Sequence, residues 1–242
     1  MTDRTGSSVD RARRVRFRDR REAGRVLAGR LSAYADRDEV VVLALPRGGV
    51  PVGYELADAL GAPLHVFAVR KVGVPGYEEL AMGAVASGGV LVLDHAMVQR
   101  LRIRAAEVER AVASERRELE RREGAYREGR DPPQLEGKIA ILVDDGLATG
   151  STMRAAARAV RQHRPARVVV AVPVAAAETC NDFGDDADEV VCVLTPTELY
   201  AVGLWYDDFS QTTDDEVREL LALAAASRRP STAETADAPS RP

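Results

Sequence analysis

Two adjacent acids, Asp144 and Asp145, directly follow a short apolar run and precede a small, hydroxyl-rich turn at 148–152. The turn leads into a helical pattern, so its backbone N–H groups and hydroxyls lie at a helix N-terminus, a favourable place for a phosphate dianion. Carboxylates beside such a turn suit a ligand that carries both a phosphate and hydroxylated or cation-bound groups. A sugar phosphate with Mg²⁺ fits this description. The alternative is an ordinary strand–turn–helix with a capping Ser or Thr, but a cap requires neither the acid pair nor the Thr-Gly after it.

A pair of glycines follows the apolar run 40–45. Gly48 and Gly49 permit unusual backbone dihedral angles and let a ligand approach backbone N–H groups closely. Arg47 precedes them, and its planar guanidinium matches phosphate oxygens. Taken alone, Arg-Gly-Gly indicates no more than a tight turn.

Two adjacent cations, Arg70 and Lys71, follow the apolar run 64–69. At the carboxyl end of a buried strand, two cations are costly unless an anion lies nearby. We therefore expect them to face an anionic ligand, with a basic surface pair as the alternative.

The apolar runs predict the scaffold that positions these residues. Short runs bounded by turn residues predict buried parallel strands at 40–45, 64–69, 139–143, 167–173 and 189–194. Helical patterns lie at 19–34, 52–60, 153–163, 174–183 and 214–226, with Asp19 and Thr213 as N-caps of the first and last. The segments 81–87 and 90–93 predict a hairpin. This order predicts an α/β fold with a doubly wound, mostly parallel sheet flanked by helices, and ligands bind at the carboxyl ends of such strands.

The ten residues Val-Asp-Asp-Gly-Leu-Ala-Thr-Gly-Ser-Thr at 143–152 resemble the phosphoribosyl pyrophosphate (PRPP) motif of the type I phosphoribosyltransferases. The resemblance implies that Asp144 and Asp145 hold the ribose hydroxyls and lie at the Mg²⁺ ion, directly or through water. It also implies that the turn wraps the 5′-phosphate. The residues of that turn are Ala148, Thr149, Gly150, Ser151 and Thr152.

In the same family, Arg47, Gly48 and Gly49 resemble the pyrophosphate-binding loop. The sequence Arg70-Lys71-Val-Gly-Val-Pro is similar to the Arg-Lys-x-Gly-x-x-Pro segment of adenine phosphoribosyltransferases, with one fewer residue before the proline. The resemblance implies that Arg70 contacts pyrophosphate. Asp144, Asp145, Arg70 and Lys71 are therefore the candidate catalytic residues.

An aromatic segment at 200–209 contains the only Trp of the chain. It resembles the segment of hypoxanthine-guanine phosphoribosyltransferases in which an aromatic ring stacks on the base and an Asp follows a Gly. The implied acceptor-binding residues are Tyr200, Trp205 and Asp207, with Gly203 as the glycine. An aromatic edge that closes the core or forms a dimer interface is an equally good interpretation.

The resemblance implies a Mg²⁺-dependent transfer of the 5-phosphoribosyl group from PRPP to an acceptor nitrogen, with release of pyrophosphate, in a homodimer. The acceptor is nucleobase-like and undetermined. Hypoxanthine-guanine enzymes carry an Asp where this chain has Ala148, and the Lys that reads a 6-oxopurine has no equivalent near 172–176. A 6-oxopurine is therefore not expected. The segment that encloses adenine in the adenine enzymes has no visible counterpart either.

Composition limits the other possibilities. The chain has 242 residues, of which 45% are hydrophobic and 30% charged, as in globular domains. Its formal net charge of −4 argues against a nucleic-acid partner. Cys180 and Cys192 form no CxxC, so neither a disulfide framework nor a zinc site is indicated. No apolar run approaches the length of a membrane span, and we expect a cytoplasmic protein.

One domain is expected at 15–226, between disordered tails at 1–14 and 227–242. It includes a hood segment at 195–213 and a helical insertion at 94–130. The insertion is interpreted either as a lid or dimer arm that brings arginines to pyrophosphate, or as a solvated helix with many salt bridges. Its balanced charge favours the second.

Two other functions remain open. One is a non-catalytic PRPP sensor or regulator on the same fold. The other, an RNA-binding regulator, is disfavoured by the acidic charge balance.

Overall fold

A five-stranded parallel sheet forms the centre of the computed structural model, which describes residues 16–127 and 132–227. Its spatial order is β2-β1-β6-β7-β8. The strands are β1 (Val40–Ala44), β2 (Leu64–Val66), β6 (Ile139–Val143), β7 (Arg167–Val174) and β8 (Glu189–Leu194). Every residue of β1 and β6 is buried, as their continuous apolar sequences predict. The predicted α/β class and its parallel strands are confirmed.

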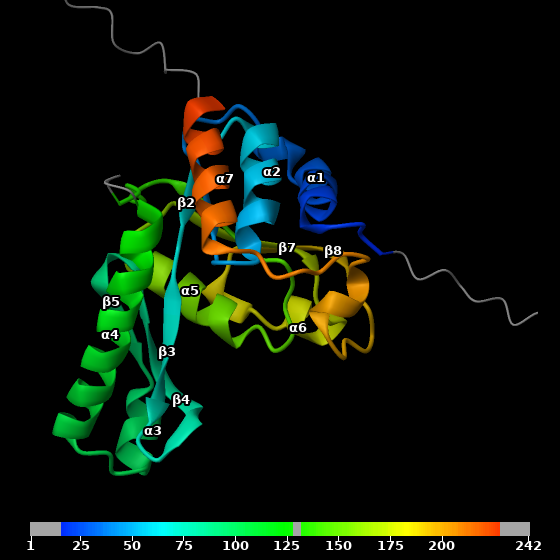
Figure 1. The fold of residues 1–242 in the computed structure, drawn as a ribbon. Helices are drawn as coiled ribbons and strands as arrows, with labels where there is room; N and C mark the ends of the chain where they lie inside the picture. The colour runs from blue at the N-terminus through cyan, green and yellow to red at the C-terminus, as the bar shows by residue number, and fades with distance from the viewer. Residues whose placement is uncertain (1–15, 128–131, 228–242) are drawn as a thin grey trace, which may run out of the picture.

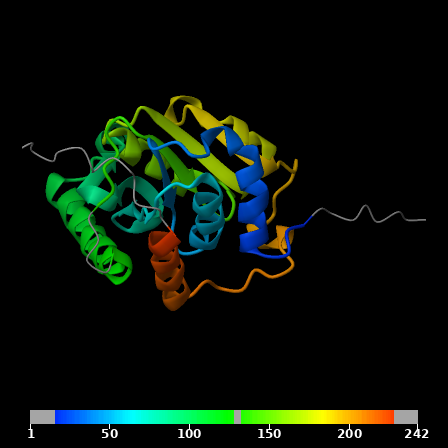
Figure 2. The ribbon, with the colours of Figure 1, turned by 90° about the horizontal axis from the view of Figure 1, so that it is seen from above.

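Helices cover both faces of this sheet (Figures 1 and 2). α1 (Arg20–Arg30), α2 (Gly49–Leu60) and α7 (Asp214–Ser227) pack on one face. α5 (Ser151–Arg161) and α6 (Ala177–Asn181) pack on the other. The sheet is therefore doubly wound, with a core on each side.

Both predicted N-caps are confirmed. The Asp19 carboxylate accepts a 2.7 Å hydrogen bond from the backbone N–H of Glu22, and the Thr213 hydroxyl accepts one of 3.1 Å from Glu216. Short 3₁₀ helices complete the connections: η1 (Ser32–Tyr34), η2 (Ser87–Gly89), η3 (Gly184–Asp186) and η4 (Val202–Trp205).

A second, antiparallel sheet leaves the central one after β2. It consists of β3 (Val69–Val74), β4 (Tyr77–Ala86) and β5 (Val90–Leu93), so the predicted hairpin before residue 93 is confirmed. The predicted single strand 64–69 is wrong, because the chain leaves the parallel sheet after Val66. Ser87 explains the break: its hydroxyl accepts a hydrogen bond from the N–H of Ala68, and its own N–H donates to the carbonyl of Ala68.

A helical hairpin follows the second sheet, in the region where the helical insertion was expected. It contains α3 (His95–Arg100) and α4 (Ala105–Arg127), and α4 covers the antiparallel sheet with Val108, Val112 and Leu119. Its outer face carries exposed ion pairs, for example Glu118 with Arg121.

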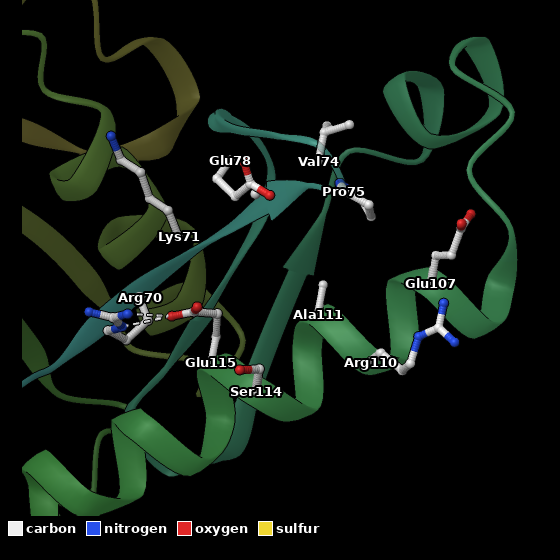
Figure 3. Close-up of a pocket in the computed structure, with 11 residues that line it drawn as sticks. Arg70, Lys71, Val74, Pro75, Glu78, Glu107, Arg110, Ala111, Ser114 and Glu115 are labelled. Carbon is white, nitrogen blue, oxygen red and sulfur yellow. Dashed lines mark hydrogen bonds and ion pairs between the residues drawn. The ribbon is translucent and has the colours of Figure 1, made fainter.

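Arg70 and Lys71 lie inside β3, and not in a loop after a parallel strand as expected. Neighbouring residues of a strand point to opposite faces, so the two cations separate (Figure 3). Arg70 points to α4 and forms a 2.6 Å ion pair with Glu115, whereas Lys71 points away from that helix.

Among the described residues, no helix combines the length and the apolar character that crossing a membrane requires.

Candidate functional site

The acid pair lies at the carboxyl end of β6, the middle strand of the parallel sheet. The backbone N–H of Asp145 donates a 2.8 Å hydrogen bond to the Asp144 carboxylate. Burial, and then the neighbouring Asp145, raise the pKa of Asp144 well above its usual value. Burial also raises the pKa of Asp145, although Arg20 opposes this shift. Two crowded acids of this kind attract a cation or hydrogen-bond donors.

Arg20, at the start of α1, supplies part of that compensation. Its Nε donates a 2.8 Å hydrogen bond to Asp145 Oδ2, and the side chains of this ion pair are only 11% and 16% exposed. Its Nη1 donates a 2.7 Å hydrogen bond to the backbone carbonyl of Ser210, and its guanidinium lies 3.9 Å from the centre of the Phe209 ring. Arg20 was not expected at the site, because in the sequence it is one of several arginines on an amphipathic helix.

The glycine loop after β1 packs directly on the acid pair. A Cβ on Gly48 would overlap the Asp145 carboxylate, and one on Gly49 would lie 2.7 Å from the Val143 carbonyl and 2.9 Å from Asp144 Cα. The peptide bond between Pro46 and Arg47 is cis. Both glycines are thus required by close contact with β6.

Arg47 points from the same loop toward the start of α7. Its Nη1 lies 3.7 Å from Asp214 Oδ1, and its side chain is 37% exposed. The same Asp214 oxygen accepts a 2.6 Å hydrogen bond from the Tyr126 hydroxyl. Arg47 is therefore loosely held and open to solvent.

The hydroxyl-rich turn leads directly into α5, as predicted. Gly150 adopts the left-handed conformation (φ 70°) at the N-cap and has no side chain to cap the helix. Thr149 and Ser151 are exposed, and their hydroxyl oxygens lie 3.2 Å apart. The Ser151 N–H donates a long, 3.5 Å hydrogen bond to the Thr149 hydroxyl. A helix N-terminus with neighbouring hydroxyls offers the donors that a phosphate requires.

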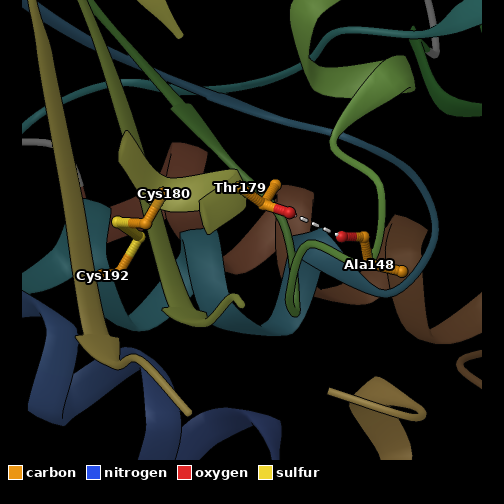
Figure 4. The surroundings of a disulfide bond; sticks show 4 residues. All are labelled: Ala148, Thr179, Cys180 and Cys192. Atoms are coloured by element: carbon orange, nitrogen blue, oxygen red, sulfur yellow. Dashed lines mark hydrogen bonds between the residues drawn. A yellow bond between two sulfur atoms is a disulfide. The ribbon is translucent and has the colours of Figure 1, made fainter. Parts of the chain in front are cut away.

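A disulfide bond lies on α6, the helix whose Thr179 contacts this turn (Figure 4). It joins Cys180 of α6 to Cys192 of β8, so the expectation that the two cysteines indicate no disulfide is wrong. Their separation along the chain gave no signal, and only the packing of α6 against β8 brings them together. The neighbouring Thr179 donates a 3.0 Å hydrogen bond to the Ala148 carbonyl, and its methyl group would lie 2.9 Å from a Cβ on Gly150.

The hood segment 195–213 is attached to the N-terminal part of the domain. The N–H of Phe17 donates to the Trp205 carbonyl at 2.9 Å, and the N–H of Asp207 donates to the Phe17 carbonyl at 2.8 Å. The Tyr206 hydroxyl donates a 2.6 Å hydrogen bond to the backbone carbonyl of Asp145. Tyr206, which the sequence analysis did not select, therefore joins the hood to the acid pair.

The three residues expected to bind the acceptor differ in exposure. Trp205 is partly buried in the aromatic cluster of the hood, and Asp207 is exposed. Tyr200 is 77% exposed, and its hydroxyl donates a 2.6 Å hydrogen bond to Glu198. Only Trp205 is thus held by the core of the hood.

Arg70 and Lys71 line a different depression, a cleft of about 510 Å³ between the second sheet and α4 (Figure 3). Its charged residues are balanced, with Arg70, Lys71 and Arg110 against Glu78, Glu107 and Glu115, although the Lys71 side chain points away from α4. The structure therefore brings together the acids and the glycine loop, while Arg70 is engaged on the α4 side.

The acid pair has the donor chemistry for Mg²⁺, which prefers carboxylate oxygens and keeps several waters. The described residues contain no group of three or more His, Cys, Asp or Glu side chains that could hold a metal alone. Asp144 and Asp145 would therefore share such an ion with oxygens of a ligand and water.

Comparisons with known proteins agree with this geometry. The model of the phosphoribosyl transferase domain matches residues 19–198. Two Mycobacterium tuberculosis proteins, from strains CDC 1551 and H37Rv and both provisionally named phosphoribosyl transferases, are 47% identical over 208 residues. These matches cover 86% of this chain and 47% of each relative, so the chain spans about half the length of these curated relatives. The crystal structure of TT1426 from Thermus thermophilus is similar with a TM-score of 0.76 and 45% identity, over 85% of this chain and 97% of that one.

Proposed function

Because the chain belongs to the phosphoribosyl transferase domain family, we propose that it binds PRPP with Mg²⁺ and transfers the 5-phosphoribosyl group to a nucleobase-like acceptor. One observation carries the proposal: the glycine loop after β1 packs against the acid pair after β6, and the same strand leads through the hydroxyl-rich turn into the N-terminus of α5. A pyrophosphate-binding loop, ribose-binding acids and a phosphate-binding turn would thus surround one ligand. In the reaction, an acceptor nitrogen forms a bond to the anomeric carbon, the bond to pyrophosphate breaks, and the acceptor's proton passes to solvent or pyrophosphate.

The residues of the site divide this work. Asp144 and Asp145 would hold the ribose hydroxyls, and their negative charge would stabilise the positive charge that develops on the ring. The N–H groups of Gly48 and Gly49, together with Arg47, would bind pyrophosphate. Bound Mg²⁺ would neutralise charge on the pyrophosphate oxygens.

The turn from Ala148 to Thr152 would hold the 5′-phosphate. The helix terminus alone contributes roughly 0.3–2 kcal/mol to binding an anion. Hydrogen bonds from Thr149, Ser151 and Thr152 would add to this. Tyr200, Trp205 and Asp207 are the residues proposed to face the acceptor. Assembly as a homodimer is part of the proposal, and light scattering tests it.

A melting experiment with PRPP and Mg²⁺ tests the central step. We expect the ligand pair to raise the melting temperature of the wild-type protein, and Asp144→Asn with Asp145→Asn to abolish this shift. The same variant without ligand shows whether the substitutions alter the fold. Absence of a shift in the wild type contradicts the proposal.

A second candidate, a PRPP sensor without turnover, is favoured by the position of Arg70. Its guanidinium forms an ion pair with Glu115 on the α4 side of the second sheet. In this position it does not perform the role expected for it, which is to contact pyrophosphate. Release of pyrophosphate with any base of a nucleobase panel supports the enzyme. Tight PRPP binding without release across the panel supports the sensor.

A further inference from the structure

Arg20 contacts three parts of the site that are far apart in the sequence. It donates to the Asp145 carboxylate after β6 and to the Ser210 carbonyl in the hood, and it stacks on the Phe209 ring. A Cβ built on Gly48 would lie 3.4 Å from its Nε, so the glycine loop also packs on it. A side chain that was only a surface cation would have none of these contacts.

The geometry at Asp145 is specific. Arg20 Nε binds Oδ2, the oxygen that lies against Gly48, and the Tyr206 hydroxyl binds the backbone carbonyl of the same residue. The carboxylate is therefore fixed at one oxygen and through its backbone.

We propose that Arg20 is a positioning residue for the ribose of the bound sugar phosphate. It fixes the Asp145 carboxylate so that this acid accepts a ribose hydroxyl, and it keeps the hood against the same acid. The proposal rests on the proposed function, because it assigns the ribose to the acid pair. Arg20 lies outside the segments at 46–49, 70–75, 143–152 and 200–209 that contain the residues expected from the sequence.

A residue of the same helix provides a matched control. Arg21 also forms an ion pair with a buried acid, Glu55, at 2.5 Å, and Arg25 contacts the same acid at 3.0 Å. Replacement of Arg21 therefore removes an ion pair between α1 and a buried acid without touching Asp145, although the Arg21 side chain is more exposed (52%) than that of Arg20 (11%). The set to compare is wild type, Arg20→Met, Arg20→Lys and Arg21→Met.

The measurement is the dissociation constant for ribose 5-phosphate and for its 2-deoxy and 3-deoxy analogues, by calorimetry with Mg²⁺. A mobile Asp145 binds the hydroxyl less well, whereas Arg20 has no hydrogen bond to the 5′-phosphate turn at 148–152 that its replacement would remove. We expect Arg20→Met to weaken binding of ribose 5-phosphate about tenfold or more, as loss of a charged hydrogen bond does. The preference for ribose 5-phosphate is the dissociation constant of a deoxy analogue divided by that of ribose 5-phosphate. In Arg20→Met this ratio should fall to about one for at least one of the two analogues, because a hydroxyl that Asp145 does not hold adds nothing to binding.

The remaining variants separate positioning from general damage. A Lys at position 20 still reaches Asp145 with one ammonium but cannot also bind Ser210 and stack on Phe209, so Arg20→Lys should restore part of the preference. Arg21→Met should keep the wild-type constants. If Arg20→Met loses the same affinity for all three sugars, the positioning role is overturned. It is also overturned if Arg20→Met discriminates against the deoxy analogues as strongly as the wild type does. If Arg20→Met does not fold, Arg20→Lys decides: an unchanged preference and affinity overturns the inference.

Failure of the proposed function gives a different result. Wild-type protein that binds neither PRPP nor ribose 5-phosphate overturns that function, and the role of Arg20 with it. Wild-type protein that binds ribose 5-phosphate, with no change in Arg20→Met, overturns only the role of Arg20.

Discussion

The Tyr206 hydroxyl donates a 2.6 Å hydrogen bond to the backbone carbonyl of Asp145, across 61 positions of the sequence. Tyr206 is 3% exposed, and burial raises the pKa of its hydroxyl far above the usual value, so the phenol stays protonated as a donor. This one bond joins the hood to the strand end that carries the acid pair.

Removal of that hydroxyl should loosen the hood. Tyr206→Phe leaves the part-buried Asp145 carbonyl without this donor, which costs about 1–3 kcal/mol of the free energy of unfolding. Urea denaturation measures the loss. Acrylamide quenching of the only Trp, Trp205, should increase because the hood opens more often. Tyr77→Phe, at a side chain that is 74% exposed, is the control and should leave both measurements unchanged.

The glycine at position 48 should tolerate no side chain. In Gly48→Ala the new Cβ overlaps the Asp145 carboxylate, so either the loop or the acid must move. We expect affinity for PRPP with Mg²⁺ to fall about tenfold or more, on the scale of a lost charged hydrogen bond. Gly29→Ala is the control, since a Cβ at Gly29 of α1 meets nothing within 4 Å. Equal PRPP affinity of the two variants contradicts the close contact.

The disulfide bond should stabilise the α6–β8 unit. Cys180→Ser with Cys192→Ser removes a link between residues 12 positions apart, and a loop of this length gives about 3 kcal/mol by chain entropy. Denaturation of the variant and of wild-type protein treated with a dithiol reductant should show the same loss. If reduction leaves the wild-type midpoint unchanged, the bond does not contribute to stability.

Tyr126 should titrate late in alkaline solution. Burial, and then the hydrogen bond to Asp214, raise its pKa to about 12 from the ordinary 10.0. The folded state therefore keeps a proton that the unfolded state loses. The stability from this group is complete below pH 10 and is lost as the pH rises toward 12. Difference absorbance of phenolate between wild type and Tyr126→Phe should show this late titration, and a midpoint near the ordinary value contradicts it.

Sequence patterns correctly predicted those elements that are determined by interactions between residues close together in the chain. The strand at 189–194 and the caps Asp19 and Thr213 follow from an apolar run and from short-range hydrogen bonds. The break after Val66 could not be predicted in this way, because 64–69 contains neither Gly nor Pro and no turn signal marks position 66. It depends on Ser87, which lies 19 positions beyond Ala68.

The same distinction applies to the site. Asp144, Asp145 and the turn at 148–152 stand together in the sequence, so their types and spacing predicted a ligand site. Arg20 and Tyr206 join them only through the folded structure. The opposite directions of Arg70 and Lys71 follow from their place within β3, and the assignment of that strand to a second sheet is a tertiary effect.

The contacts of Arg20 have a consequence for the order in which the protein folds. Its hydrogen bonds span 125 positions to Asp145 and 190 positions to Ser210. Contacts this distant in the chain carry a high loop-closure entropy, and a chain made from its N-terminus can form the second of them only after the hood has been synthesised. We therefore expect the ligand site to be completed after the sheet beneath it, so that nascent chains have the scaffold before they can bind a ligand.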